Sequence, residues 1–172
     1  DTLCGALVVR QLTPWFENLA KRQVRSPKVY IRDTGLLHTL LGLESFAELE
    51  GHPKLGASFE GFVVEHVVAR VGERNAFFWA TPAGAELDLL VHVGGKRIGI
   101  EIKYADAPRI TRSMHVALED LKLERLFVVV PGGETYPLGD RVEVRPLPQL
   151  LEWLDEQGRR GGGRRRADGH GE

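Results

Sequence analysis

Cysteine and long apolar runs are both scarce in this chain of 172 residues. Cys4 is the only cysteine, so the chain forms no internal disulfide and no zinc site built from several thiolates. The longest apolar runs, such as 126–130, fall far short of the roughly 20 residues that a membrane-spanning helix needs. No basic segment followed by an apolar core is visible at the N-terminus, so we expect no secretory signal. These absences predict a cytoplasmic protein with no membrane partner.

The net charge is only −1, but the charge is unevenly distributed. Residues 1–32 contain six Lys and Arg against two acidic residues, and residues 158–172 contain five Arg against two. The second segment has no apolar side chain larger than Ala167, so it buries too little surface to offset its ordering entropy, and we expect it to be disordered. Basic segments contact phosphates. DNA is therefore a candidate partner, and the alternative is a plain solvated surface.

Apolar periodicity predicts one α/β domain over residues 33–157. A first helix follows the potential cap residues Asp33 and Thr34, and a second begins at Ser58 and ends at Gly72. The remaining expected elements are three strands, a helix, two strands and a closing helix, at 76–79, 85–93, 96–103, 109–122, 126–130, 142–145 and 147–157.

The connections between these elements predict a mixed sheet flanked by helices. Gly94-Gly95 is a hairpin signal, so the first three strands are expected to be antiparallel. A crossover helix then places strand 126–130 parallel to its neighbour. Strict alternation in 85–93 places Glu86, Asp88 and Leu90 on one face and the intervening apolar residues on the other. Gly99, on the polar face of strand 96–103, is expected to leave room for a ligand.

A small group of charged residues on two neighbouring strands could perform chemistry. Glu101 and Lys103 are two residues apart and therefore share a face, and Asp88 lies on the preceding strand. Two carboxylates with waters and phosphate oxygens suit Mg²⁺, and a lysine can hold a water or a phosphate oxygen. Glu60, near the start of the second helix, could add a third carboxylate. The alternative is a solvent-exposed Glu–Lys pair that contributes about 0–1 kcal/mol.

Five ordered blocks of the sequence resemble the DUF4143 domain, over roughly residues 5–155. The blocks are residues 28–37, 56–60, 78–79, 84–88 and 101–103. That domain forms the C-terminal part of a family of prokaryotic AAA-type ATPases. Its pattern is similar to the PD-(D/E)xK superfamily, the restriction-endonuclease-like nucleases whose core is helix, three strands, helix, strand. Gly61 departs from the family pattern, which has Asn after the glutamate.

The resemblance implies a role for each of the charged residues. Asp88 and Glu101 would bind Mg²⁺ or Mn²⁺, Lys103 would position water or phosphate, and Glu60 would complete a catalytic group of four. Glu60 and Glu86 are further candidates for the metal ion. Two functions stay open: metal-dependent hydrolysis of DNA, and a DNA- or protein-binding module that keeps the fold without cutting.

The resemblance also sets expectations for the rest of the protein. Residues 51–58 have the outline of a phosphate loop, but Ala57 stands where such a loop requires Lys, so we expect no ATP binding in this chain. The ATPase domain of a full-length family protein is an expected partner. Residues 1–32 resemble the truncated end of a winged-helix-like connector. The oligomeric state is left open.

Overall fold

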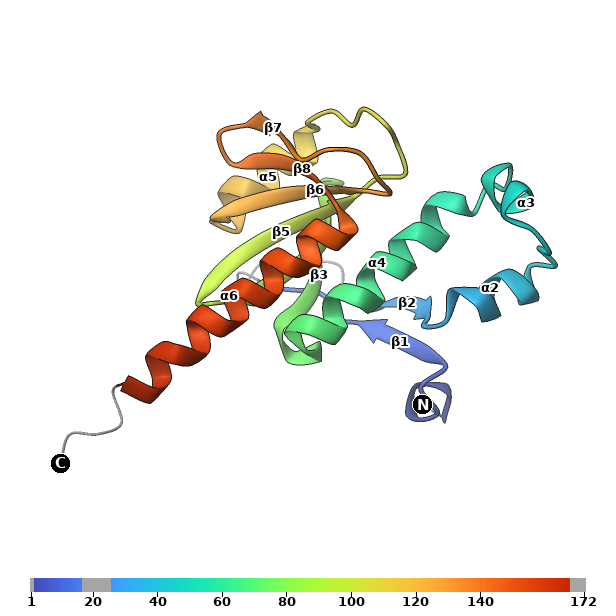
Figure 1. The fold of residues 1–172 in the computed structure, drawn as a ribbon, viewed down its shortest axis with the longest axis horizontal. Helices are drawn as coiled ribbons and strands as arrows, with labels where there is room; N and C mark the ends of the chain where they lie inside the picture. The colour runs from blue at the N-terminus through green and yellow to red at the C-terminus, as the bar shows by residue number, and fades with distance from the viewer. Residues whose placement is uncertain (1, 17–25, 168–172) are drawn as a thin grey trace.

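The computed structural model describes residues 2–16 and 26–167, of which 160–167 are described by their backbone alone (Figure 1). The elements are, in order, α1(Thr2–Gly5), β1(Val9–Leu12), β2(Lys28–Ile31), α2(Thr34–Leu40), α3(Phe46–Glu50), α4(Leu55–Val71), a 3₁₀ turn η1(Glu73–Asn75), β3(Ala76–Ala80), β4(Glu86–Val93), β5(Lys96–Ile102), α5(Arg112–Asp120), β6(Arg125–Val130), β7(Tyr136–Gly139), β8(Val142–Pro146) and α6(Leu147–Ala167). No helix among these described residues is long and apolar enough to cross a membrane.

The centre of the molecule is a six-stranded mixed sheet in the order β3-β4-β5-β6-β8-β7. Strands β3, β4 and β5 pair antiparallel in sequence. Strand β6 pairs in parallel with β5, β8 pairs in parallel with β6, and β7 pairs antiparallel with β8. Gly94 and Gly95 make the β4–β5 turn with φ of 60° and 76°, values that an L side chain rarely adopts. The predicted mixed sheet flanked by helices is therefore confirmed.

Two apolar clusters cover the two faces of this sheet. Helices α4 and α6 contribute to one cluster, and α5 contributes to the other (Figure 1). Thr111 caps α5 by accepting a hydrogen bond from the Met114 amide. Strand β6 is buried on both faces, as its continuous apolar run predicts.

Several boundaries differ from the sequence expectations. Helix α4 begins at Leu55 rather than after Ser58, because Ser58 is a buried helical residue whose hydroxyl lies 2.7 Å from His38 Nε2. Helix α3 and strand β7 were not expected. Pro137 lies in β7 at the edge of the sheet, where a missing amide hydrogen is tolerated.

Strand β4 does not alternate as predicted. Leu87 packs in the cluster of α5, whereas Leu89 packs in the cluster of α4 and α6. The pairing with β3 shifts register here: Phe77 pairs with Leu90 but Trp79 pairs with Leu87. An extra residue of this kind is a β-bulge, which re-aims the side chains beside it. Asp88 lies at this bulge.

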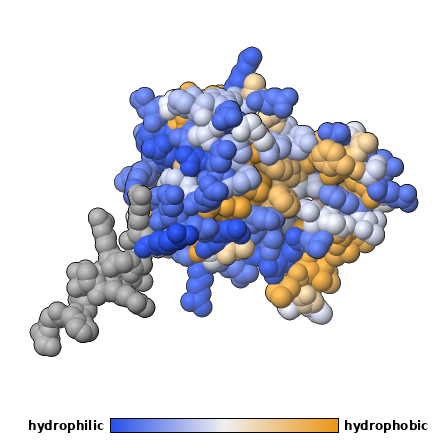
Figure 2. Space-filling view, viewed as in Figure 1, coloured by the Kyte–Doolittle hydropathy of each residue, from blue (hydrophilic) through white to orange (hydrophobic). Residues whose placement is uncertain are grey.

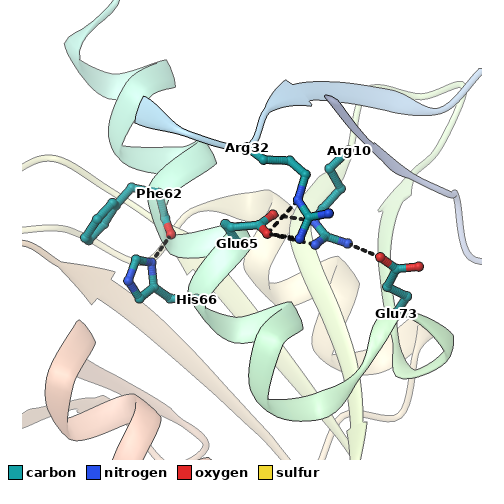
Figure 3. Close-up of polar contacts among 6 residues, drawn as sticks. All are labelled: Arg10, Arg32, Phe62, Glu65, His66 and Glu73. Atoms are coloured by element: carbon teal, nitrogen blue, oxygen red, sulfur yellow. Dashed lines mark hydrogen bonds and ion pairs between the residues drawn. The ribbon is translucent and has the colours of Figure 1, made fainter. Parts of the chain in front are cut away.

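The N-terminal segment packs against the domain through its own two-stranded sheet. Strands β1 and β2 pair antiparallel. Arg10 and Arg32 both donate to Glu65 on α4, and Arg10 also donates to Glu73 (Figure 3). Farther along, the Trp15 amide donates to the Phe78 carbonyl on the edge strand β3. Whether this segment is a winged-helix remnant stays a prediction.

Exposed apolar side chains concentrate in the N-terminal third of the chain. Figure 2 shows apolar surface on the side of the molecule that carries α1, α2 and α3. The exposed large residues there are Leu3, Leu7, Val29, Leu36, Leu40, Leu41 and Phe46. This side therefore offers an apolar contact surface, whereas the sheet and its helices enclose their own core.

The C-terminal segment begins as a helix rather than as disordered chain. Helix α6 extends to Ala167, past the expected end at Gln157. Leu147, Leu150 and Leu154 are buried and anchor the first turns, and extending an existing helix is far easier than nucleating one. Residues 168–172 of the expected tail lie outside the described residues.

Candidate functional site

A cluster of charged side chains forms where β2, α4, β4 and β5 meet. Its members are Lys28 and Tyr30 from β2, Glu60 from α4, Glu86 and Asp88 from β4, and Glu101 and Lys103 at the end of β5. The structure thus brings together all of the residues that the sequence singled out for chemistry. It adds Lys28 and Tyr30.

Asp88 is nearly buried and lies at the centre of the cluster. Its side chain is 13% exposed, and Oδ2 accepts a hydrogen bond of 2.9 Å from the Ile102 amide. Burial, with the negative charges of Glu101 and Glu60, raises the pKa of Asp88 to about 7 against the opposing effects of Ile102 and Lys28. Burial and the neighbouring carboxylates therefore both disfavour the charged form of Asp88, even with Lys28 nearby.

Glu101 and Lys103 form an ion pair beside Asp88. Lys103 Nζ lies 2.7 Å from Glu101 Oε1, which confirms that the two side chains share a face. Burial opposes the charged form of Lys103, but the hydrogen bond and charge of Glu101 prevail and raise the pKa of Lys103. The Glu101 side chain is 9% exposed, and its Oε2 is buried with no hydrogen-bond partner among the described residues. Because Glu101 is nearly buried, this pair differs from the fully solvent-exposed Glu–Lys pair that the sequence left open as the alternative.

Glu60 is held at the edge of the cluster by the hairpin strand β2. The Tyr30 hydroxyl donates to Glu60 Oε1 at 2.6 Å, and Lys28 Nζ lies 3.3 Å from the same oxygen. Burial and this hydrogen bond raise the pKa of Tyr30, so the phenol stays protonated. The carboxylate of Glu60 is thus engaged by two donors from the N-terminal segment.

Lys28 contacts carboxylates from both α4 and β4. Besides Glu60, its Nζ lies 2.5 Å from Glu86 Oε1 and 3.6 Å from Asp88 Oδ1. Burial disfavours the charged form, but the hydrogen bond to Glu86 and the charges of Glu60, Asp88 and Glu86 raise the pKa of Lys28. Neither Lys28 nor Tyr30 was predicted from the sequence to be a site residue. Their spacing, which places both on one side of a strand, was the available signal.

The donor set suits a hard cation held by two carboxylates rather than a complete protein cage. Among residues 2–16 and 26–167, no group of three or more His, Cys, Asp or Glu side chains could hold a metal ion. Asp88 lies close enough to Glu101 for the Glu101 charge to raise its pKa. Glu101 Oε2 has no hydrogen-bond partner within the described part of the chain. Mg²⁺ is commonly bound by one or two carboxylates, with waters and substrate phosphates completing its shell. Glu60 and Glu86 face Lys28 instead.

Gly99 does not open space for a ligand as expected. A Cβ at this position would lie 2.6 Å from Leu123 Cδ1 and 3.3 Å from Leu126 Cγ. Both leucines belong to the apolar cluster on the α5 side of the sheet. The missing side chain lets β5 pack closely against this cluster, so the glycine serves packing rather than binding.

The fold and the cluster define a mixed α/β domain with an acidic, partly buried site at the junction with its N-terminal hairpin. The chain belongs to the family described as "Domain of unknown function (DUF4143)", which matches residues 55–150. Residues 1–47 match a second family, "Domain of unknown function (DUF8612)". The family boundary therefore falls between the hairpin, which carries Lys28, and the helix, which carries Glu60.

Similar proteins are found in two mycobacteria. The chain is 54% identical over 151 residues to "Uncharacterized protein Rv2008c" of Mycobacterium tuberculosis and equally to "Uncharacterized protein Mb2031c" of Mycobacterium bovis. Each match covers 88% of this chain but 34% of the relative, so the chain spans about a third of the length of these relatives. No solved structure matches it significantly.

Proposed function

We propose that this chain is the nuclease-like C-terminal domain of an AAA-type ATPase and hydrolyses phosphodiester bonds in DNA with the help of Mg²⁺ or Mn²⁺. One observation carries the proposal: Asp88 and Glu101 interact while nearly buried, Lys103 lies beside them, and Glu101 Oε2 has no partner among the described residues. Burying charged groups is costly unless a partner or a function retains them. The PD-(D/E)xK resemblance supports the same assignment.

Each side chain would have a distinct task in this reaction. Asp88 and Glu101 would hold the divalent ion, which supplies charge neutralisation and a water of lowered pKa. The Ile102 amide fixes the Asp88 carboxylate, and Glu101 orients the Lys103 ammonium. Lys103, 41% exposed, reaches outward to hold the attacking water or a phosphate oxygen. Glu60 would complete the site from α4.

A second candidate is a module that binds DNA or protein without cutting. It is favoured by Lys28, because an ammonium that contacts three carboxylates already neutralises part of the site. The lack of a complete metal cage among the described residues is compatible with it. In that case Asp88 and Lys103 would serve stability rather than chemistry.

Cleavage assays with matched variants separate the two candidates. Single-stranded and duplex DNA are incubated with wild type, Asp88→Asn and Lys103→Met, with Mg²⁺, with Mn²⁺ or with a chelator. Glu124→Gln is the matched control, since Glu124 forms an exposed ion pair with Lys96. The nuclease proposal expects metal-dependent cleavage that both site variants lose and the control keeps. DNA binding by wild type without cleavage under any condition would contradict it and support the binding module.

A further inference from the structure

Lys28 places a positive charge among the carboxylates that surround the proposed metal site. Its Nζ lies within 3.6 Å of oxygens from Glu60, Glu86 and Asp88. The Lys28 side chain is 25% exposed and that of Asp88 is 13% exposed. In so little solvent the interaction between charges is screened less than at the surface.

The position of Lys28 is not explained by a need to attach the hairpin. Strand β2 is already fixed to α4 by Arg32, and strand β1 by Arg10, both on Glu65 (Figure 3). Tyr30 adds a hydrogen bond to Glu60. The hairpin would therefore stay docked without Lys28, whereas the acidic site would lose its contact to this cation.

The charge balance of the cluster indicates that Lys28 supplies positive charge that a divalent cation could supply instead. Four carboxylates, Glu60, Glu86, Asp88 and Glu101, face two ammonium groups, Lys28 and Lys103. Even so, burial and the charges of Glu101 and Glu60 raise the pKa of Asp88. A divalent cation and Lys28 would thus repel each other while competing for the same carboxylate of Asp88.

We propose that Lys28 is a built-in competitor of the divalent ion, so that the N-terminal hairpin controls metal occupancy of the site. This inference rests on the proposed function, because it takes Asp88 as a metal ligand. The lysine side chain is flexible, so it can swing away from Asp88 while β2 remains paired with β1. Coupling of this kind is reciprocal: a bound ion displaces Lys28, and a hairpin that holds Lys28 in place weakens binding of the ion.

The test measures binding of Mn²⁺ itself by calorimetry, with no DNA present. Wild type is compared with Lys28→Met, Lys28→Gln, Arg32→Met and Asp88→Asn, each first confirmed as folded by circular dichroism. Arg32→Met is the matched control, because it removes a cation that holds the same strand to the same helix without touching the cluster. Both Lys28 variants should bind Mn²⁺ about tenfold more tightly than wild type, within the range typical of coupled sites. Arg32→Met should bind like wild type.

Thermal melting provides a second readout that does not depend on the calorimeter's sensitivity. At a fixed ligand concentration, a protein gains more stability from a ligand that its folded state binds more tightly, and the gain grows with the logarithm of the affinity. Mn²⁺ should therefore raise the Tm of Lys28→Met by more than it raises the Tm of wild type. The rise should disappear in the double variant Lys28→Met/Asp88→Asn.

The outcomes distinguish failure of this inference from failure of the proposed function. Wild type that binds Mn²⁺ through Asp88, with Lys28 variants that bind no more tightly, overturns the inference alone. An equal gain in Arg32→Met also overturns it, because the effect would then come from a loosened hairpin. No binding by wild type or by either Lys28 variant overturns both the metal site and the inference.

Discussion

Two clusters of charge join the N-terminal hairpin to helix α4, and they are built in opposite ways. In one, Glu65 lies between two guanidinium groups, those of Arg10 and Arg32 (Figure 3). Burial favours the neutral form of Glu65, but the two arginines prevail and lower its pKa. In the other, burial and then the negative charges of Glu101 and Glu60 raise the pKa of Asp88 to about 7.

The contrast separates a cluster that holds the hairpin in place from the cluster that we propose as the functional site. The Glu65 cluster satisfies its own charge, so it needs no further ligand and adds stability to the docked hairpin. The Asp88 cluster retains excess negative charge in a nearly buried place, which is typical of a functional site. The sequence separates the two poorly, because each cluster includes a glutamate of α4 that faces basic residues of the hairpin segment.

The largest expected loss of unfolding free energy comes from removing Glu65, the carboxylate between Arg10 and Arg32. Glu65→Ala leaves the nearly buried Arg10 with Glu73 as its remaining ion-pair partner among the described residues. Breaking a buried pair from one side typically costs about 3–5 kcal/mol. Urea unfolding should show this loss of unfolding free energy. Asp155→Ala, which breaks a pair of exposed side chains with Arg70, should cost less than about 1 kcal/mol. Similar losses in both variants would contradict the distinction.

Neutralising Asp88, at the centre of the proposed site, should instead raise the free energy of unfolding at neutral and higher pH. The folded pKa of Asp88 lies above its ordinary value of 3.8, so the folded state binds more protons than the unfolded state between about pH 4 and 7. Stability of the wild type therefore falls as pH rises through this window. Asp88→Asn carries no ionisable group at this position, so its free energy of unfolding does not fall in this way. At pH 8 the variant should be more stable than wild type by about 2–4 kcal/mol.

Urea unfolding of both proteins at pH 4, 6 and 8 checks this sign. The two free energies should lie close together at pH 4 and separate progressively toward pH 8. A variant that is less stable than wild type at pH 8 would show that Asp88 is a structural anion, like Glu65.

A smaller effect on the unfolding free energy is expected where a neutral hydroxyl of the hairpin, that of Tyr30, donates a hydrogen bond to the site. Tyr30→Phe removes the hydroxyl that donates to Glu60, and hydrogen bonds to charged groups contribute about 1.5–3 kcal/mol. We expect a loss near the lower end, because Lys28 still contacts Glu60. The exposed Tyr104 gives the matched control, and Tyr104→Phe should leave the unfolding free energy unchanged.

The smallest expected effect concerns the glycine that follows Glu60. A Cβ at Gly61 would lie 3.5 Å from Tyr30 Cδ1, an ordinary contact. Gly61→Ala should therefore stabilise α4 by about 0.5–1 kcal/mol through helix propensity. Destabilisation in thermal melting would instead mean that Tyr30 requires the bare glycine backbone to reach Glu60.

Local patterns in the sequence predicted most of the sheet. The Gly94-Gly95 turn and the apolar run of β6 both specify structure through neighbouring residues, and both are confirmed. The cap at Asp33, which accepts from the Leu36 amide, is local in the same way. Strand β7 was missed because its pairing with β8 depends on edge geometry rather than on an apolar pattern.

The site was predictable only in part, for physical reasons. The contact between Glu101 and Lys103 follows from strand periodicity alone. The position of Asp88 depends on a bulge that no alternation pattern reveals, and Lys28 reaches Glu60 across 32 positions of sequence. Such distant pairs are set by packing of the hairpin on α4, so the spacing of Lys28 and Tyr30 indicated a shared side of the strand but not the carboxylate that they contact.

Titration with Mn²⁺ of wild type beside Glu101→Gln tests the central claim most directly. The variant keeps the shape of the side chain but removes the charge that lies beside Asp88 and the buried oxygen without a partner. Wild type should bind Mn²⁺, Glu101→Gln should lose that binding, and the exposed control Glu124→Gln should retain it. A folded wild type that binds no Mn²⁺, or a Glu101→Gln variant that binds it equally well, would contradict the assignment of Asp88 and Glu101 as a divalent-ion site.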